Sequence, residues 1–120
     1  MNNKEFGQQL ELRTRKFAIS IIKLSTSLPN TPEARVIKNQ ITKSGTSIGA
    51  NYREANRARS NQDFKNKISI SESEASETIY WLEIIRDMSW CESVAIKQIM
   101  AESSEILAIF TSIRKRMNNK

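Results

Sequence analysis

The carboxylates of Glu54 and Glu77 are the side chains best suited to acid–base chemistry in this sequence of 120 residues. A positioned pair of carboxylates can serve as general acid and general base. No pattern nearby supplies a nucleophile, an oxyanion donor or a glycine-rich phosphate loop. A carboxylate metal site is a second alternative, but di-iron helical bundles use Glu-x-x-His motifs and this chain has no histidine. We therefore predict no enzymatic activity, no catalytic residue, no cofactor and no metal.

The single cysteine, Cys91, cannot form a disulfide within the chain, which favours a reducing, cytoplasmic location. A thiol at the start of a helix can have a lowered pKa. Without a histidine partner, we interpret Cys91 as an ordinary half-buried thiol and not as a nucleophile. The first residues lack the apolar core of a signal peptide, and no apolar run is long enough to span a membrane. We expect a cytoplasmic protein with no membrane partner.

Five polar residues near the middle of the sequence are expected to be partly buried. They are Asn51, Glu54, Asp63, Glu74 and Glu77. Glu74 and Glu77 are three residues apart and share one face of a helix. Arg53 or Arg57, on an antiparallel neighbouring helix, can reach back to these acids. We interpret the set as a buried polar network that fixes the register of two helices, a role that buried polar groups have in some proteins.

Basic residues form two clusters. The first is Arg53, Arg57 and Arg59, and the second is Arg114, Lys115 and Arg116. Such clusters contact phosphates in a sequence-tolerant and salt-dependent way. The alternative is that both clusters only stabilise the negative ends of helices. The net charge of +6 is unevenly spread, because acids outnumber bases only in segment 61–88. A basic protein attracts polyanions such as RNA, although a basic helix packed beside the acidic one would also explain the pattern.

Four helices are predicted to position these residues, at about 4–27, 32–57, 61–88 and 90–116. The chain has only three glycines and two prolines, which favours long helices over many short strands. Matched lengths and short connections predict an all-α, antiparallel up-down-up-down four-helix bundle. At this length, residues 1–120 are expected to form a single domain.

Helix starts are marked by capping patterns. Thr31 followed by Pro32 suits an N-cap and a first helical position. Ser60 with Asp63 forms an aspartate variant of the capping box, and Ser89 with Glu92 forms a full Ser-x-x-Glu box. The expected core stripes follow three- and four-residue steps. They are Phe6, Leu10, Phe17, Ile21, Leu24 and Leu28; Ile37, Ile41, Ser44, Ile48, Asn51 and Ala55; Phe64, Ile68, Ser71, Ala75, Thr78, Leu82 and Ile85; and Ala95, Ile99, Glu102, Ile106, Ile109 and Ile113.

Gly45 and Gly49 lie four residues apart in the second of these helices. Each glycine costs about 1 kcal/mol of helix propensity relative to alanine, so we expect them to permit a close approach of the backbone to a neighbouring helix. A loop over residues 44–46 is the alternative.

Segment 61–88 carries a second apolar group outside its core stripe. The residues expected to form it are Ile79, Tyr80, Trp81, Ile84 and Met88. A helix of a small monomeric bundle should keep a polar face, so we predict that Ile79, Tyr80, Trp81 and Ile84 are buried against another subunit. The alternative is that Tyr80 and Trp81 stack on RNA bases.

The central stretch resembles a known family. It contains Ser44-Gly45-Thr46-Ser47-Ile48-Gly49-Ala50-Asn51, Arg53-Glu54-Ala55, Arg57, Ser60, Asp63-Phe64, Glu74-Ala75-Ser76-Glu77-Thr78 and Tyr80-Trp81-Leu82. With these residues the chain resembles the four-helix-bundle family of bacterial 23S rRNA intervening-sequence proteins. The resemblance implies a homopentameric ring and implies no catalytic activity. A related branch, the accessory proteins of diversity-generating retroelements, works with a reverse transcriptase and nucleic acid.

Two functions from different classes remain open. The first is a non-enzymatic oligomer that binds RNA, another nucleic acid or a nucleoprotein partner through its basic surfaces. The second is a protein-interaction scaffold without affinity for nucleic acid. Binding of RNA at physiological salt separates the two, because it depends on the basic clusters in the first function only.

Overall fold

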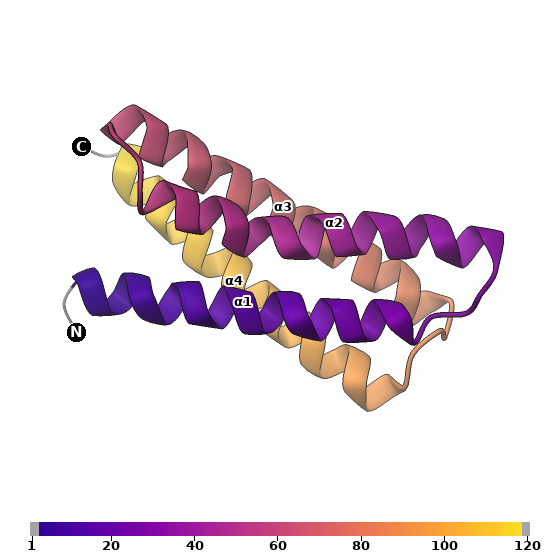
Figure 1. Ribbon diagram of the computed structural model, residues 1–120. Helices are drawn as coiled ribbons and strands as arrows, with labels where there is room; N and C mark the ends of the chain where they lie inside the picture. Colours follow the sequence, from indigo (N-terminus) through magenta and orange to yellow (C-terminus); the bar gives the residue numbers. More distant parts are fainter. Residues whose placement is uncertain (1–2, 119–120) are drawn as a thin grey trace.

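Four antiparallel helices are found in the part of the chain that the structure describes, which confirms the predicted all-α bundle. The computed structural model describes residues 3–118. Its helices are α1 (Asn3–Thr26), α2 (Pro32–Ala55), α3 (Asn61–Asp87) and α4 (Ser93–Asn118). The α2–α3 connection lies at one end of the bundle together with both chain ends, and the other two connections lie at the opposite end (Figure 1). The chain direction therefore alternates from each helix to the next.

Helices α2 and α3 form the centre of the bundle. α2 packs against α1 and α3, and α3 packs in turn against α4. α4 runs obliquely to α1, which it meets over a smaller contact (Figure 1). The molecule measures 46 × 26 × 21 Å, and its long axis is somewhat longer than its helices of 24 to 27 residues, which span about 36 to 41 Å at 1.5 Å per residue. None of the four helices has an apolar stretch sufficient to cross a lipid bilayer, within the part of the chain that the structure describes.

The predicted core stripe of α3 is confirmed. Ile68, Ala75, Leu82 and Ile85 are fully buried, and Phe64 packs against them from a partly buried position. The polar members of the stripe are buried as well, because their hydroxyls find hydrogen-bond acceptors inside the bundle. The remaining helices and the α1–α2 connection, which contains Leu28, bury the following hydrophobic residues: Leu10, Phe17, Ile21, Leu24 and Leu28; Ala34, Ile41, Ile48, Tyr52 and Ala55; and Ile96, Ile106 and Phe110.

The predicted starts of α2 and α3 are confirmed by their caps. The Thr31 side chain accepts a hydrogen bond from the Ala34 N–H at 3.1 Å, with Pro32 in the first helical turn. The Ser60 side chain accepts one from the Asp63 N–H at 3.0 Å. These bonds satisfy backbone donors that the first turn of a helix leaves free.

The predicted start of α4 is wrong, since α4 begins at Ser93 and not near residue 90. Ser89 does not cap α4 but ends α3, in the left-handed conformation with φ 57°. Its N–H donates to the Arg86 carbonyl, and the Trp90 N–H donates to the Ile85 carbonyl. This is the Schellman pattern, which usually employs glycine. The Ser-x-x-Glu sequence therefore misled the prediction, because the same serine is used to close the preceding helix.

Two of the predicted stripes are also partly wrong. In α4 the buried side is centred on Ile96, Ser103, Ile106 and Phe110, whereas Glu102 is only partly buried. In α1 the first predicted member, Phe6, is 38% exposed.

Gly45 and Gly49 lie within a continuous helix, so the alternative of a loop over residues 44–46 is wrong. Both are at close contacts between α1 and α2. A Cβ atom on Gly45 would lie 2.8 Å from Cγ2 of Ile21, and one on Gly49 would lie 2.8 Å from Oγ1 of Thr14. The predicted close approach is confirmed.

We expect the substitution Gly45→Ala to destabilise the protein by about 1 to 2 kcal/mol. Overpacking against the fully buried Ile21 costs about 1 to 3 kcal/mol, and the gain in helix propensity returns up to about 1 kcal/mol. Gly7→Ala is the matched control, because the nearest atoms to its added Cβ are 3.7 Å away; there the propensity gain should stabilise the protein. Urea denaturation measures both, and a Gly45→Ala protein at least as stable as the wild type would contradict the close contact.

Candidate nucleic-acid interface

The two predicted basic clusters lie at the same end of the bundle. Both follow from the topology, because α2 ends at Ala55 and α4 ends at Asn118, at the end of the bundle where α1 begins (Figure 1). A pocket of about 320 Å³ at this end is lined by Asn56, just after α2, and by Arg116 of α4, which shows that the two helix ends are neighbours. We call this surface the basic end and define it by the six predicted residues. They are Arg53, Arg57, Arg59, Arg114, Lys115 and Arg116.

Four of the six cations at the basic end are unpaired. Arg57, Arg59, Lys115 and Arg116 are exposed, and none forms an ion pair with any residue from 3 to 118. Arg53 differs, because its Nε lies 3.4 Å from a carboxylate oxygen of Glu11. The predicted contact from Arg53 or Arg57 to the acids of α3 is therefore not formed: Arg53 turns to α1 instead. The four unpaired cations are free to contact an anionic partner.

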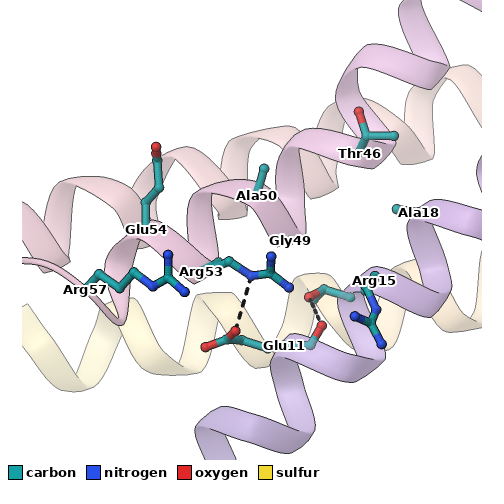
Figure 2. Close-up of a pocket in the computed structure, with 10 residues that line it drawn as sticks. Glu11, Arg15, Ala18, Thr46, Gly49, Ala50, Arg53, Glu54 and Arg57 are labelled. Atoms are coloured by element: carbon teal, nitrogen blue, oxygen red, sulfur yellow. Dashed lines mark hydrogen bonds and ion pairs between the residues drawn. The ribbon is translucent and has the colours of Figure 1, made fainter.

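A groove between α1 and α2 extends the basic end along one side of the bundle (Figure 2). It has a volume of about 430 Å³ and a floor of small residues that includes Ala18, Gly49 and Ala50. Its rim carries the following charged side chains: Glu11, Arg15, Arg53, Glu54 and Arg57. Sequence reasoning missed Arg15, since only the packing of α1 on α2 places it on the rim of the same groove as Arg53 and Arg57.

Arg114 is held by a partly buried carboxylate, that of Glu72. Its Nε donates to Glu72 at 2.5 Å, and the Thr111 hydroxyl donates to the same carboxylate at 2.7 Å. Burial raises the pKa of Glu72, but these two hydrogen bonds outweigh it and hold the pKa below the usual value. Glu72 therefore stays ionised and neutralises Arg114, which makes Arg114 a structural residue more than a phosphate ligand.

Stability should fall as the pH drops below about 5, and Glu72 should contribute to the fall. Its folded-state pKa is lowered, so its stabilisation is present above the unfolded pKa of about 4.5 and is lost as pH falls through the folded pKa. Glu102, held by hydrogen bonds from Arg13, acts in the same direction. Glu74 acts in the opposite direction, because burial and the nearby Glu77 raise its pKa.

The test is Glu72→Gln, compared with wild type by urea denaturation from pH 7 to pH 3. We expect a loss of about 1 kcal/mol at pH 7 and a flatter decline at acidic pH. If the free energy of unfolding falls with pH as steeply in the variant as in the wild type, Glu72 does not titrate below its unfolded pKa.

The predicted buried polar network is wrong in two members and replaced by a different set. Glu54 and Asp63 are exposed, whereas Asn51, Glu74 and Glu77 are partly buried, as predicted. The polar side chains that are fully buried carry hydroxyls: the Thr78 hydroxyl donates to the Ser44 hydroxyl at 2.9 Å, and Ser71 donates to the Ile48 carbonyl at 2.9 Å. Hydroxyls fit a tightly packed seam at a lower desolvation cost than carboxylates.

The candidate acid–base pair is not assembled. Glu54 lies at the end of α2 and pairs with Lys67 at 3.0 Å, whereas Glu77 accepts a hydrogen bond from the Trp81 indole at 3.3 Å. Glu77 comes more than four turns after the start of α3, so the two carboxylates are about 20 Å apart along the bundle. Across residues 3–118, no three acidic or cysteine side chains gather as metal ligands do.

Cys91 lies in the connection before α4 and is partly buried. Burial raises the pKa of its thiol, against a smaller lowering by a backbone hydrogen bond from Glu92. The interpretation as an ordinary half-buried thiol fits this environment, and the lowered pKa of a reactive thiol is not found.

The predicted interface residues divide between two sides of α3. Tyr80 is 56% exposed, and its ring meets Trp81 edge to face at a centroid distance of 5.0 Å. Trp81 and Ile84 are half-buried. Ile79 follows Glu72 by two helical turns and so lies on the flank that faces α4. An outer surface is thus formed by Tyr80, Trp81 and Ile84, without Ile79.

The sequence matches the family model described as 23S rRNA-intervening sequence protein over residues 9–112. The chain belongs to this family. It is also similar to a solved crystal structure, a protein with unknown function from the S23 ribosomal protein family of Bacteroides thetaiotaomicron. The two are 40% identical with a TM-score of 0.82, over 88% of this chain and 98% of the other. Among curated proteins, no significant match is found. The family resemblance predicted from the central stretch is confirmed.

Proposed function

We propose that this protein is a non-enzymatic, cytoplasmic oligomer that binds RNA, alone or within a nucleoprotein, through its basic end. The observation that carries the proposal is the convergence of two clusters from different halves of the sequence on one surface. Four cations there are exposed and unpaired: Arg57, Arg59, Lys115 and Arg116. Helix stabilisation alone would not require so many cations at one end, because α2 and α4 each need only the last turn neutralised.

The chemistry favours the phosphate backbone over individual bases. Guanidinium groups bind phosphate through two parallel hydrogen bonds, and such contacts do not depend on sequence. Tyr80 and Trp81, the aromatic residues considered for stacking on RNA bases, lie far along α3 from the basic end. The expected binding is therefore tolerant of sequence and sensitive to salt.

Oligomerisation strengthens such weak contacts. The partly exposed Tyr80, Trp81 and Ile84 support association of α3 with another copy, and the family resemblance supports a homopentamer. Several basic ends held together bind one RNA with a higher effective concentration than separate chains. The single cysteine supports the cytoplasmic location.

The proposal is tested by fluorescence anisotropy with a labelled, structured RNA, titrated from about 50 to 300 mM salt. We expect binding at physiological salt, with an affinity that falls linearly on a logarithmic salt scale. Light scattering at each salt concentration gives the mass of the free and bound protein. Absence of binding at low salt would leave the scaffold function, and the basic end would then serve only to stabilise helix ends.

A further inference from the structure

A second apolar seam runs along the outside of α1. It has three-, four- and three-residue steps, the spacing of a helix that packs on another helix. Its members are Leu12, Arg15, Ile19 and Ile22. The three apolar members are 43 to 46% exposed, although the core of α1 lies on the opposite side, at Leu10, Phe17 and Ile21. We call this the outer α1 seam; no residue from 3 to 118 covers it.

A matching seam runs along the outside of α3. Its members are Ile70, Glu74, Glu77, Trp81, Ile84 and Met88, at alternating steps of four and three residues. Ile70 and Met88 are 42% and 53% exposed. It is separate from the core stripe of the same helix, which passes through Ala75 and Leu82. We call this the outer α3 seam.

The two seams face in different directions. The backbones of α1 and α3 do not approach each other over their described residues, because α2 and α4 pack between them. They are therefore diagonal helices of the bundle, and their outer sides point away from each other. One copy of the chain cannot bring its own two seams together, but two copies can.

The charges of the seams are complementary. The outer α1 seam contains Arg15 and is flanked by Lys16 and Lys23. The outer α3 seam contains Glu74 and Glu77, which form no ion pair with any described residue. A two-fold contact between two α3 seams would oppose carboxylates, and one between two α1 seams would oppose cations, so like contacts are disfavoured.

We propose that the outer α1 seam of one copy packs on the outer α3 seam of a second copy, with Arg15 facing Glu74 and Glu77. The proposal rests on the oligomerisation included in the proposed function. It adds that the surface which covers α3 of one copy is the outer α1 seam of another copy. Ile19 and Ile22 then cover Trp81 and Ile84, which explains why α1 has exposed apolar residues at helix-packing spacing. Such a contact is head to tail: each copy keeps one free seam until a ring closes.

The contact is tested with two seam variants, Ile19→Asp/Ile22→Asp and Ile70→Asp/Met88→Asp. Three of the four replaced side chains are at least 43% exposed and the fourth is 42% exposed, so both variants should fold, and circular dichroism checks this. Each variant alone is expected to be monomeric by light scattering. Their mixture is expected to form a one-to-one pair, because each supplies the intact seam that the other lacks. Labelling one variant with ¹⁵N distinguishes the two chains by native mass spectrometry.

The matched control is Val36→Asp/Val94→Asp, which changes two valines on α2 and α4 that are 57% and 60% exposed and outside both seams. It should associate like the wild type. If the α1-seam variant still associates and the α3-seam variant does not, two α3 seams pair with each other. That result would overturn this proposal and leave the oligomerisation in the proposed function intact. Two monomeric variants whose mixture forms no pair would also overturn it. A monomeric wild type would overturn both this contact and the oligomerisation in the proposed function, while RNA binding is read separately by anisotropy.

Discussion

Phe110→Ala should be the most destabilising single truncation among those considered, costing about 3 to 5 kcal/mol. The Phe110 ring is completely buried and meets the Tyr52 ring edge to face, at a centroid distance of 5.4 Å. Its removal leaves a cavity between α2 and α4 and also loses an aromatic contact worth about 0.5 to 1.5 kcal/mol. Domains of this size have about 5 to 15 kcal/mol of total stability, so the variant should lose a large part of it.

Urea denaturation at a fixed protein concentration measures the effect, because association makes apparent stability depend on concentration. Phe6→Ala is the matched control: the same atoms are removed from a side chain that is 38% exposed. We expect a loss below about 1.5 kcal/mol there. Equal losses of stability in the two variants would mean that the buried face assigned to α4 is wrong.

The comparison of these two phenylalanines shows what hydrophobic spacing predicts. Phe6 continues the apolar stripe of α1, but it lies within one turn of the helix start, where the neighbouring helices also end. Periodicity gives the direction of a side chain and does not show whether a neighbour is present to cover it. Phe110 stands outside the stripe predicted for α4, because α4 carries isoleucines on several sides and its sequence allows more than one choice of buried face.

The core stripe of α3 was predicted better, although a second apolar group lies outside it. Ser71, Ala75 and Thr78 are small, and small residues are what a tightly packed seam with α2 requires. Glu54 and Asp63 were wrongly expected to be partly buried, because each lies within one turn of a helix end, where its side chain reaches solvent. Glu74 and Glu77 are partly buried, as predicted.

The candidate site was predictable in part. The clusters are visible in the sequence as runs of arginine and lysine, and the antiparallel topology alone brings the ends of α2 and α4 together. Which cations are neutralised was not predictable. The partner of Arg53 is on α1 and that of Arg114 is on α3, and both pairs depend on the rotation of each helix about its axis.

That difference between free and neutralised cations leads to the largest effect expected on function. The variant Arg57→Gln/Arg59→Gln/Lys115→Gln/Arg116→Gln should bind RNA about 100-fold more weakly at physiological salt. Four phosphate contacts fewer should also reduce the slope of log affinity against log salt by about 3. Replacing Arg53 and Arg114 instead should weaken RNA binding less, since each already faces a carboxylate, and should destabilise the fold more.

The matched control removes the same number of charges from the opposite end of the bundle. Lys23, Arg35, Lys38 and Lys97 lie near the connections α1–α2 and α3–α4, away from the basic end (Figure 1). Their replacement by glutamine lowers the net charge of +6 equally, so any general attraction of a basic protein for RNA falls equally in both variants. The salt slope should stay close to that of the wild type in the control. Equal losses of affinity in the two variants would show that RNA responds to net charge alone, and the basic end would then have no special role.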